Sequence, residues 1–187
     1  AGAHAAVASW IEETAGARAK EFVELLAYHC LEAYLGARDD GLAPMEVEDL
    51  RLRAFRALLG VAAEAHRRFA LAKATSAIEQ ALRIASGPLE RITALEWEGM
   101  IARSDYQGDA SWRSFREAID LRLRHTPGAR RAIAWACVNG LENPLRWPGS
   151  MKTFPEIDEV RRYLAICADH VEDERSEEGI RLLTLRA

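Results

Sequence analysis

The sequence predicts an all-α fold built from antiparallel helix pairs, and three observations support this prediction. Apolar residues recur at helical spacing along most of the chain, no segment shows the alternation of a strand, and short turns rich in Gly and Pro separate the apolar stripes. The 187 residues are 49% hydrophobic and 29% charged, which is typical of a folded domain. A chain of this length can form one core or several stacked helix pairs.

The first two helices follow from their apolar positions. A short helix bearing Val7, Trp10 and Ile11 is expected to end at Gly16. In the next helix, apolar and small residues recur at i, i+3, i+4, i+7, i+8 and i+11 and form one stripe: Phe22, Leu25, Leu26, His29, Cys30 and Ala33. Gly36 is expected to end this helix, and residues 37–44 form a polar turn whose Pro44 is suited to open the next one.

The rest of the chain is divided in the same way. Further helices are predicted at about 46–68, 71–85, 88–104, 110–124 and 129–141, where the Thr126–Pro127 pair serves as N-cap and first residue of the last of these. The segment ENPLRWPGSMKTFP, residues 142–155, contains three prolines and one glycine and is expected to be irregular. A helix from Glu156 to about 174 follows, and Ser176 caps a last segment, 176–187, that is expected to lack a packing partner.

The chain also resembles itself at an offset of 37 residues. AIEQALRI at 77–84 aligns with SFREAIDL at 114–121, and the aligned turns place Phe69 over Tyr106. The preceding helices align Phe55 with Ile92, Leu58 with Leu95, Ala62 with Gly99 and Ala65 with Ala102. The sequence therefore predicts repeating helix pairs at about 46–85, 88–124 and 129–174, with the start of another at 176–187, all within a region 44–187 that follows an N-terminal pair at 1–43.

The small residues of these pairs resemble those of the tetratricopeptide repeat. Small residues recur at 62 and 99, 65 and 102, 74 and 111, and 81 and 118, with a large apolar residue, Ile78 or Phe115, in the second helix of each pair. The period is longer than the usual 34 residues and the consensus Trp and Pro positions are unfilled, so the repeat is degenerate. The resemblance implies a right-handed solenoid whose concave side binds peptides or other domains.

A second resemblance concerns the N-terminal pair. Trp10-Ile11-Glu12-Glu13, Gly16 and the LAYHC stretch at 26–30 resemble the segment that follows the ATPase module of bacterial regulators related to class III adenylate and guanylate cyclases. The repeats resemble the helical region of the same proteins. The resemblance implies a parent with a cyclase domain and a P-loop ATPase, in which residues 1–43 link to the ATPase. Related ATPase-linked transcription regulators share the P-loop ATPase and the C-terminal helical repeats.

The composition limits the classes of function. A net charge of −4 without a clustered basic surface gives no reason to expect nucleic acid, and no apolar run is long enough for a membrane span. The three cysteines form no CxxC pair, which favours reduced thiols in the cytoplasm. There is no GxxxxGK[ST] phosphate loop. We expect no catalytic, cofactor or metal site in this chain.

Two groups of polar residues could instead indicate a catalytic site or a metal site. His29 and Cys30 could form a nucleophile pair, but adjacent helical residues point about 100° apart, which favours a buried structural role. In the segment 169–174, His170 and Glu174, and likewise Asp169 and Asp173, have the i, i+4 spacing that can chelate a metal ion. A solvated helix end explains this segment equally well, so a helical metal-dependent enzyme is only a minor alternative.

The remaining candidates concern interaction. Arg146 and Trp147 lie in the irregular loop, which either binds a partner or caps the core, and Tyr106 is a further candidate contact. Arg130 and Arg131 can cap helix carbonyls or anchor an acidic peptide. The leading interpretation is a non-catalytic regulatory module that binds another protein or its own upstream domains. The alternative is a sensor that binds a small-molecule inducer in the groove of the solenoid.

Overall fold

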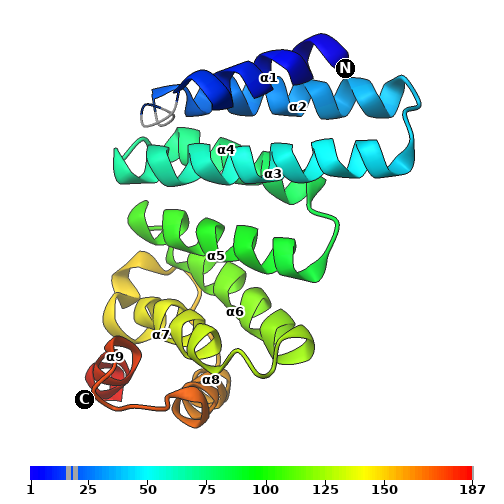
Figure 1. The fold of residues 1–187 in the computed structure, drawn as a ribbon. Helices are drawn as coiled ribbons and strands as arrows, with labels where there is room; N and C mark the ends of the chain where they lie inside the picture. Colours follow the sequence, from blue (N-terminus) through cyan, green and yellow to red (C-terminus); the bar gives the residue numbers. More distant parts are fainter. Residues whose placement is uncertain (16–17, 19–20, 187) are drawn as a thin grey trace. The chain divides into compact units, whose positions relative to one another are not determined.

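The structure is a computed structural model that describes residues 1–15, 18 and 21–186. This part of the chain forms nine α-helices, one short 3-10 helix and no strand, which confirms the all-α prediction (Figure 1). Helix contacts divide the chain into two units, residues 1–85 and 86–187. The helices are α1 (Gly2–Ala15), α2 (Val23–Asp39), α3 (Pro44–Arg67), α4 (Leu71–Ile84), α5 (Pro88–Ser104), α6 (Gly108–His125), α7 (Arg130–Arg146), α8 (Ile157–His170) and α9 (Glu177–Arg186).

In the first unit each helix packs against the next one along the chain, from α1 to α4. Small side chains bring the helices together, since Ala8, Cys30 and Ala54 form a buried cluster between α1, α2 and α3. Arg51 is buried on α3, where its guanidinium forms two hydrogen bonds of 2.7 and 2.8 Å to the Glu48 carboxylate and one of 2.8 Å to the Ile84 carbonyl oxygen. This arginine therefore ties the start of α3 to the end of α4.

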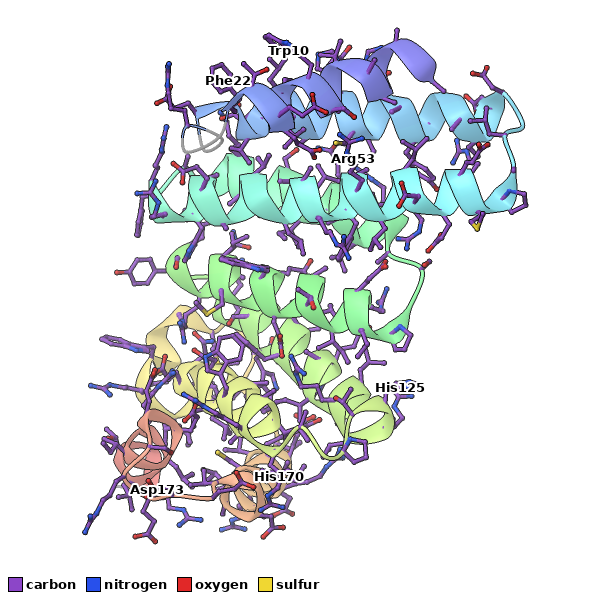
Figure 2. The ribbon with its side chains drawn as sticks, viewed as in Figure 1. Trp10, Phe22, Arg53, His125, His170 and Asp173 are labelled. Atoms are coloured by element: carbon purple, nitrogen blue, oxygen red, sulfur yellow. The ribbon has the colours of Figure 1, made fainter. Side chains whose placement is uncertain are left out.

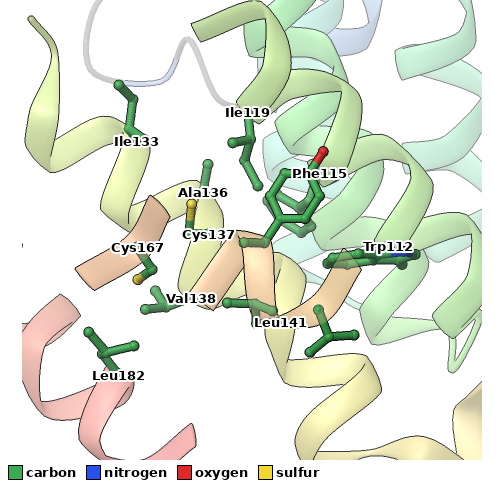
Figure 3. Packing of buried hydrophobic residues seen from close by; sticks show 12 residues of the cluster. Trp112, Phe115, Ile119, Ile133, Ala136, Cys137, Val138, Leu141, Cys167 and Leu182 are labelled. Atoms are coloured by element: carbon green, nitrogen blue, oxygen red, sulfur yellow. The ribbon is translucent and has the colours of Figure 1, made fainter. Parts of the chain in front are cut away.

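The second unit is organised around α7, which packs against α5, α6, α8 and α9. Its core is apolar and draws on four helices (Figure 3). Burial of this many apolar side chains is the main source of stability for the unit. The core consists of Trp112, Phe115, Ile119, Ile133, Ala136, Cys137, Val138, Leu141, Val160, Tyr163, Cys167 and Leu182.

The helix pairs α3–α4 and α5–α6 are joined by the same turn, 37 positions apart. Phe69 and Tyr106 both adopt the left-handed backbone region, with φ of 60° and 56°. In each turn the next residue donates its backbone N–H to a carbonyl five residues back, Ala70 to Ala65 and Gln107 to Ala102, both at 2.9 Å. The small and apolar positions aligned within the helices are buried in both pairs, whereas the aligned turn residues Phe69 and Tyr106 are exposed. The buried pairs are 55 and 92, 58 and 95, 62 and 99, 65 and 102, 74 and 111, 78 and 115, and 81 and 118.

The expected end of the second helix at Gly36 was wrong. Gly36 lies inside α2, which continues to Asp39, and the turn instead contains Gly41 at a φ of +68°. A Cβ at Gly36 would lie 2.9 Å from the backbone nitrogen of Ala1, so this glycine permits close packing of α1 instead of ending the helix. The expected break at Gly16 lies outside the described residues. Pro44 opens α3 as predicted.

The boundaries around α7 also differ from expectation. Thr126 caps the C-terminus of α6, donating its hydroxyl to the Arg122 carbonyl at 3.2 Å, and α7 begins only at Arg130. The helix then continues past 141 to Arg146 and includes Pro144. Proline is tolerated here because it falls in the last turn of the helix. Its ring crowds the carbonyl group four positions earlier, which belongs to Gly140.

The C-terminal helices were predicted only in part. α8 ends at His170 instead of about 174. Ser176 caps α9 as expected, because its hydroxyl oxygen accepts the Gly179 backbone N–H at 3.1 Å. The expectation that the last segment lacks a partner was wrong: α9 packs on α7 and α8, and Leu182 belongs to the core.

Candidate interaction surface

The buried face of α2 differs from the stripe expected from helical spacing. Its buried residues are all small: Ala27, Cys30, Ala33 and Ala37. Phe22 and Leu25, both predicted to be in the stripe, have exposed fractions of 37% and 46%. The physical reason is that α1 and α3 approach α2 over its small side chains, where backbones come closest. The large apolar side chains are consequently left at the surface.

These exposed side chains line a groove between α1 and α2, which we call the Trp10 groove. Trp10 itself is 63% exposed, far more than is usual for tryptophan. Figure 2 labels Trp10 and Phe22 near the connection between the two helices. The cavity has a volume of about 170 Å³. It is lined by Trp10, Ile11, Thr14, Ala15, Arg18, Phe22 and Leu25.

The segment that forms this groove carries more acidic than basic side chains. Among the described lining residues Arg18 is the one cation, and its guanidinium already binds Glu21 at 2.7 Å and lies 5.9 Å from the Phe22 ring centre. Residues 1–39 contain six acidic and three basic side chains. An apolar groove in a segment of net negative charge favours a partner whose apolar residue is flanked by lysine or arginine.

The five residues predicted as an interaction surface do not form one patch. Arg146 and Trp147 lie at the C-terminal end of α7, whereas Arg130 and Arg131 lie at its N-terminal end. A 17-residue helix is about 25 Å long, so the two groups are separated by roughly that distance. Tyr106 lies in the α5–α6 turn and is 79% exposed. A binding role for these residues stays a prediction.

Arg130 and Arg131 hold helix ends together, one of the two roles considered for them. Arg130 donates to the Asp169 carbonyl oxygen in the last turn of α8 and forms an ion pair of 3.0 Å with Glu172. Arg131 binds the Glu178 carboxylate at the start of α9 at 3.1 Å. Both arginines therefore link α7 to the α8–α9 region.

The irregular loop is pinned to the start of α6. The Asp109 carboxylate accepts the backbone N–H groups of Lys152 and Thr153 at 2.7 and 2.9 Å. A Cβ at Gly108 would collide with Ser150, so the loop passes directly over the backbone of α6. Trp147 nevertheless keeps 55% of its surface exposed. The loop thus packs as a cap while leaving its tryptophan accessible.

Replacing Asp109 with asparagine is expected to release this loop. Hydrogen bonds from the backbone N–H groups of Lys152 and then Thr153 lower the pKa of Asp109. Because the folded pKa is lowered, the anchoring is complete above about pH 4 and is lost as pH falls through the lowered pKa. At pH 7, D109N should speed amide exchange at Lys152 and Thr153 by about tenfold.

The matched control for this prediction is D158N. Asp158 is a carboxylate in the first turn of α8 with an 88% exposed side chain, paired only with Arg161. NMR-detected hydrogen exchange should show no change at Lys152 or Thr153 in D158N. Equal protection of both amides in D109N and the parent protein would contradict the anchoring role.

The structure does not provide the geometry required for a His29–Cys30 nucleophile pair or for a metal site at 169–174. Cys30 is buried, whereas His29 is partly buried and faces His4, so their side chains do not converge on one atom. His170 ends α8, and Asp173 lies in the following turn, so the i, i+4 spacing required for chelation is not formed (Figure 2). Among the described residues no group of three or more His, Cys, Asp or Glu side chains could hold a metal ion.

Comparison with protein-family models, with curated proteins and with solved structures finds no match for this chain. Within the described ranges, no helix combines the length and apolar character that crossing a bilayer requires. The function is therefore inferred from the geometry of the chain and its sequence.

Proposed function

We propose that this chain is a non-catalytic, protein-binding regulatory module, and that the Trp10 groove is its docking site. The observation that supports this proposal is the exposure of Trp10, Phe22 and Leu25 around one cavity while alanines fill the helix interface. Exposed aromatic and aliphatic groups that surround a pocket are typical of protein interaction sites. Tryptophan is among the residues most enriched at the energetic centres of such interfaces.

The occupant that fits this groove is an amphipathic helix of a partner protein, with apolar anchors and basic flanking residues. The cavity of about 170 Å³ is smaller than the roughly 300–1,000 Å³ of typical small-molecule sites. It can instead receive one or two side chains from a helix laid along α1 and α2. Residues 1–39 carry more acidic than basic side chains, which would attract the basic flanks, although Glu21 already pairs with Arg18 and Glu24 with Lys73.

The proposed architecture is a tetratricopeptide-like right-handed solenoid. The shared turn at Phe69 and Tyr106 and the matching buried positions of α3–α4 and α5–α6 support this proposal. A helix pair with one apolar face gains stability by stacking on another pair.

The parent proposed for this module is a multidomain bacterial regulator with an ATPase module, related to nucleotide cyclases. The sequence resemblance of residues 10–13 and 26–30 supports this assignment. In such a parent the partner helix would act by binding one conformational state more tightly than the other. No bond is made or broken within this chain under the proposal.

Site-specific photo-crosslinking from position 10 tests the docking site. A photoreactive phenylalanine analogue replaces Trp10 in the full-length protein in its host, and adducts are mapped by mass spectrometry. We expect adducts to one amphipathic, basic-flanked helix of a partner protein. The control places the same analogue at Met45, which is 83% exposed on α3 and outside the groove.

Three outcomes of this experiment would contradict the proposal. One is no adduct above the Met45 control. The second is an adduct to another copy of the same chain, which would assign the groove to self-association. The third is an adduct within the same polypeptide, which would assign it to an intramolecular contact.

A further inference from the structure

Two histidines join α1 to α2 through their ring nitrogens. The Nδ1 atom of His4 lies 2.9 Å from the Nδ1 atom of His29, with ring centres 5.0 Å apart. Both rings are partly buried, and the Tyr28 ring packs edge-on against each, at 5.8 Å from His4 and 5.2 Å from His29. A hydrogen bond between two Nδ1 atoms requires one of them to be protonated and the other to be a bare acceptor.

We propose that the His4–His29 pair is a proton-sensitive latch that holds α1 on α2 and thereby keeps the Trp10 groove formed. When both imidazoles are protonated, neither Nδ1 can accept, so the hydrogen bond is lost. Two positive charges would also face each other across 2.9 Å. The docked state is therefore incompatible with the doubly protonated pair.

The groove depends on this latch because both helices build it. Trp10 and Ile11 come from α1, whereas Phe22 and Leu25 lie at or near the start of α2. Only two side chains of α1, Ala8 and Ile11, are described as buried. With so small an apolar contact, the docking of α1 depends on few polar contacts, namely the His4–His29 pair and the Arg53 hydrogen bonds to Glu12 and Ser9. Loss of the histidine contact removes one of them and weakens docking.

The other charged groups near α1 bind partners of their own. Arg53 of α3 binds Glu12 at 2.7 Å and Ser9 at 3.1 Å, which anchors the C-terminal half of α1 (Figure 2). Cys30 of α2 is buried, and the charges that act on it are Arg53 and Glu12.

No carboxylate among the described residues forms a hydrogen bond or ion pair with either imidazole ring, so none would neutralise a second proton there. The Tyr28 ring is the aromatic neighbour that contacts both imidazoles.

The direction of the pH effect follows from proton linkage. The undocked state can bind one proton more than the docked state, so acidification favours undocking. Imidazole is the side chain that ordinarily changes charge between pH 5 and 8. One extra proton changes the docking equilibrium by at most about tenfold per pH unit.

Amide hydrogen exchange of α1 in the whole chain, without any partner, tests the latch. After correction for the intrinsic effect of pH, exchange in α1 should be about tenfold or more faster at pH 5.5 than at pH 7.5. In H29Q this increase should disappear, because the glutamine amide can both donate to and accept from His4 and adds no second charge. H170Q is the matched control, since His170 hydrogen-bonds only the Ile166 carbonyl within α8, and it should keep the response.

An α1 exchange rate that is independent of pH in the parent protein, or an unchanged pH response in H29Q, would overturn the latch. The consequence for partner binding rests on the proposed function, but the exchange measurement does not. If α1 opens as expected while Trp10 captures no partner, the proposed function fails and the latch stands. If Trp10 captures the same partner at both pH values and α1 stays protected, the latch fails and the proposed function stands.

Discussion

Replacing Glu142 with glutamine is expected to destabilise the second unit by about 2–4 kcal/mol, because two largely buried arginines share this one carboxylate. Arg103 of α5 donates to one carboxylate oxygen at 2.6 Å and Arg181 of α9 to the other at 2.7 Å. Asn139 on α7 accepts from both arginines at 2.8 and 3.0 Å. Burial lowers the pKa of Arg103, yet both guanidinium groups remain charged at neutral pH. Glutamine would leave the charges of Arg103 and Arg181 without their anion. Its amide N–H group would also point toward an N–H donor of one of these arginines.

Urea denaturation followed by circular dichroism measures this effect. The matched control is E177Q, since Glu177 is 68% exposed and lies 3.6 Å from the same Arg181. An exposed pair of this kind contributes no more than about 1 kcal/mol. If E142Q and E177Q unfold at the same urea concentration as the parent protein, the three-helix network does not stabilise the unit.

The second large effect is expected at Gly99, where an added methyl group has no space. A Cβ built at Gly99 lies 2.7 Å from the ring of Phe115, which is fully buried. On its other side Phe115 is held by Gly140 of α7, whose own added Cβ would lie 2.9 Å from the Phe115 Cβ. The ring therefore cannot retreat, and G99A should cost about 1–3 kcal/mol of unfolding free energy. An ordinary helical Gly to Ala change would instead stabilise by up to about 1 kcal/mol.

The repeat supplies the compensating substitution. The positions 37 residues earlier are Ala62 and Ile78, so the first unit already pairs alanine with a smaller apolar side chain. The double variant G99A/F115I should be less destabilised than the sum of its single variants, with a coupling energy of about 0.5–3 kcal/mol. G60A serves as the control in α3, because its Cβ would lie 3.2 Å from a Val23 methyl on partly buried α2 surface. Strict additivity of G99A and F115I would contradict the equivalence of the two pairs.

The sequence predicts the helices well where local signals define them. Pro44 and Ser176 mark helix starts by local chemistry that tertiary packing does not override. The alignment of Phe69 with Tyr106 follows from the repeat, and the two turns have the same backbone conformation.

The misses share a physical cause, which is that the deciding partner is distant along the chain. Helical spacing identifies which residues share a face of α2, but the approach of α1 and α3 decides that alanines are buried and Phe22 is exposed. Glu142 is 39 residues from each of the two arginines that it binds, so no local pattern marks it. The latch was missed for the same reason: His4 lies 25 residues from His29.

The central claim is that the helix pairs of this chain stack on one another as repeats and leave a surface for a partner. Small-angle X-ray scattering of the whole 187-residue chain tests it most directly. A compact globule of this length has a radius of gyration of about 16 Å. A stack of helix pairs predicts a clearly larger radius and a pair-distance distribution with an extended tail. A radius near that of the globule, with one symmetric peak, would contradict the account.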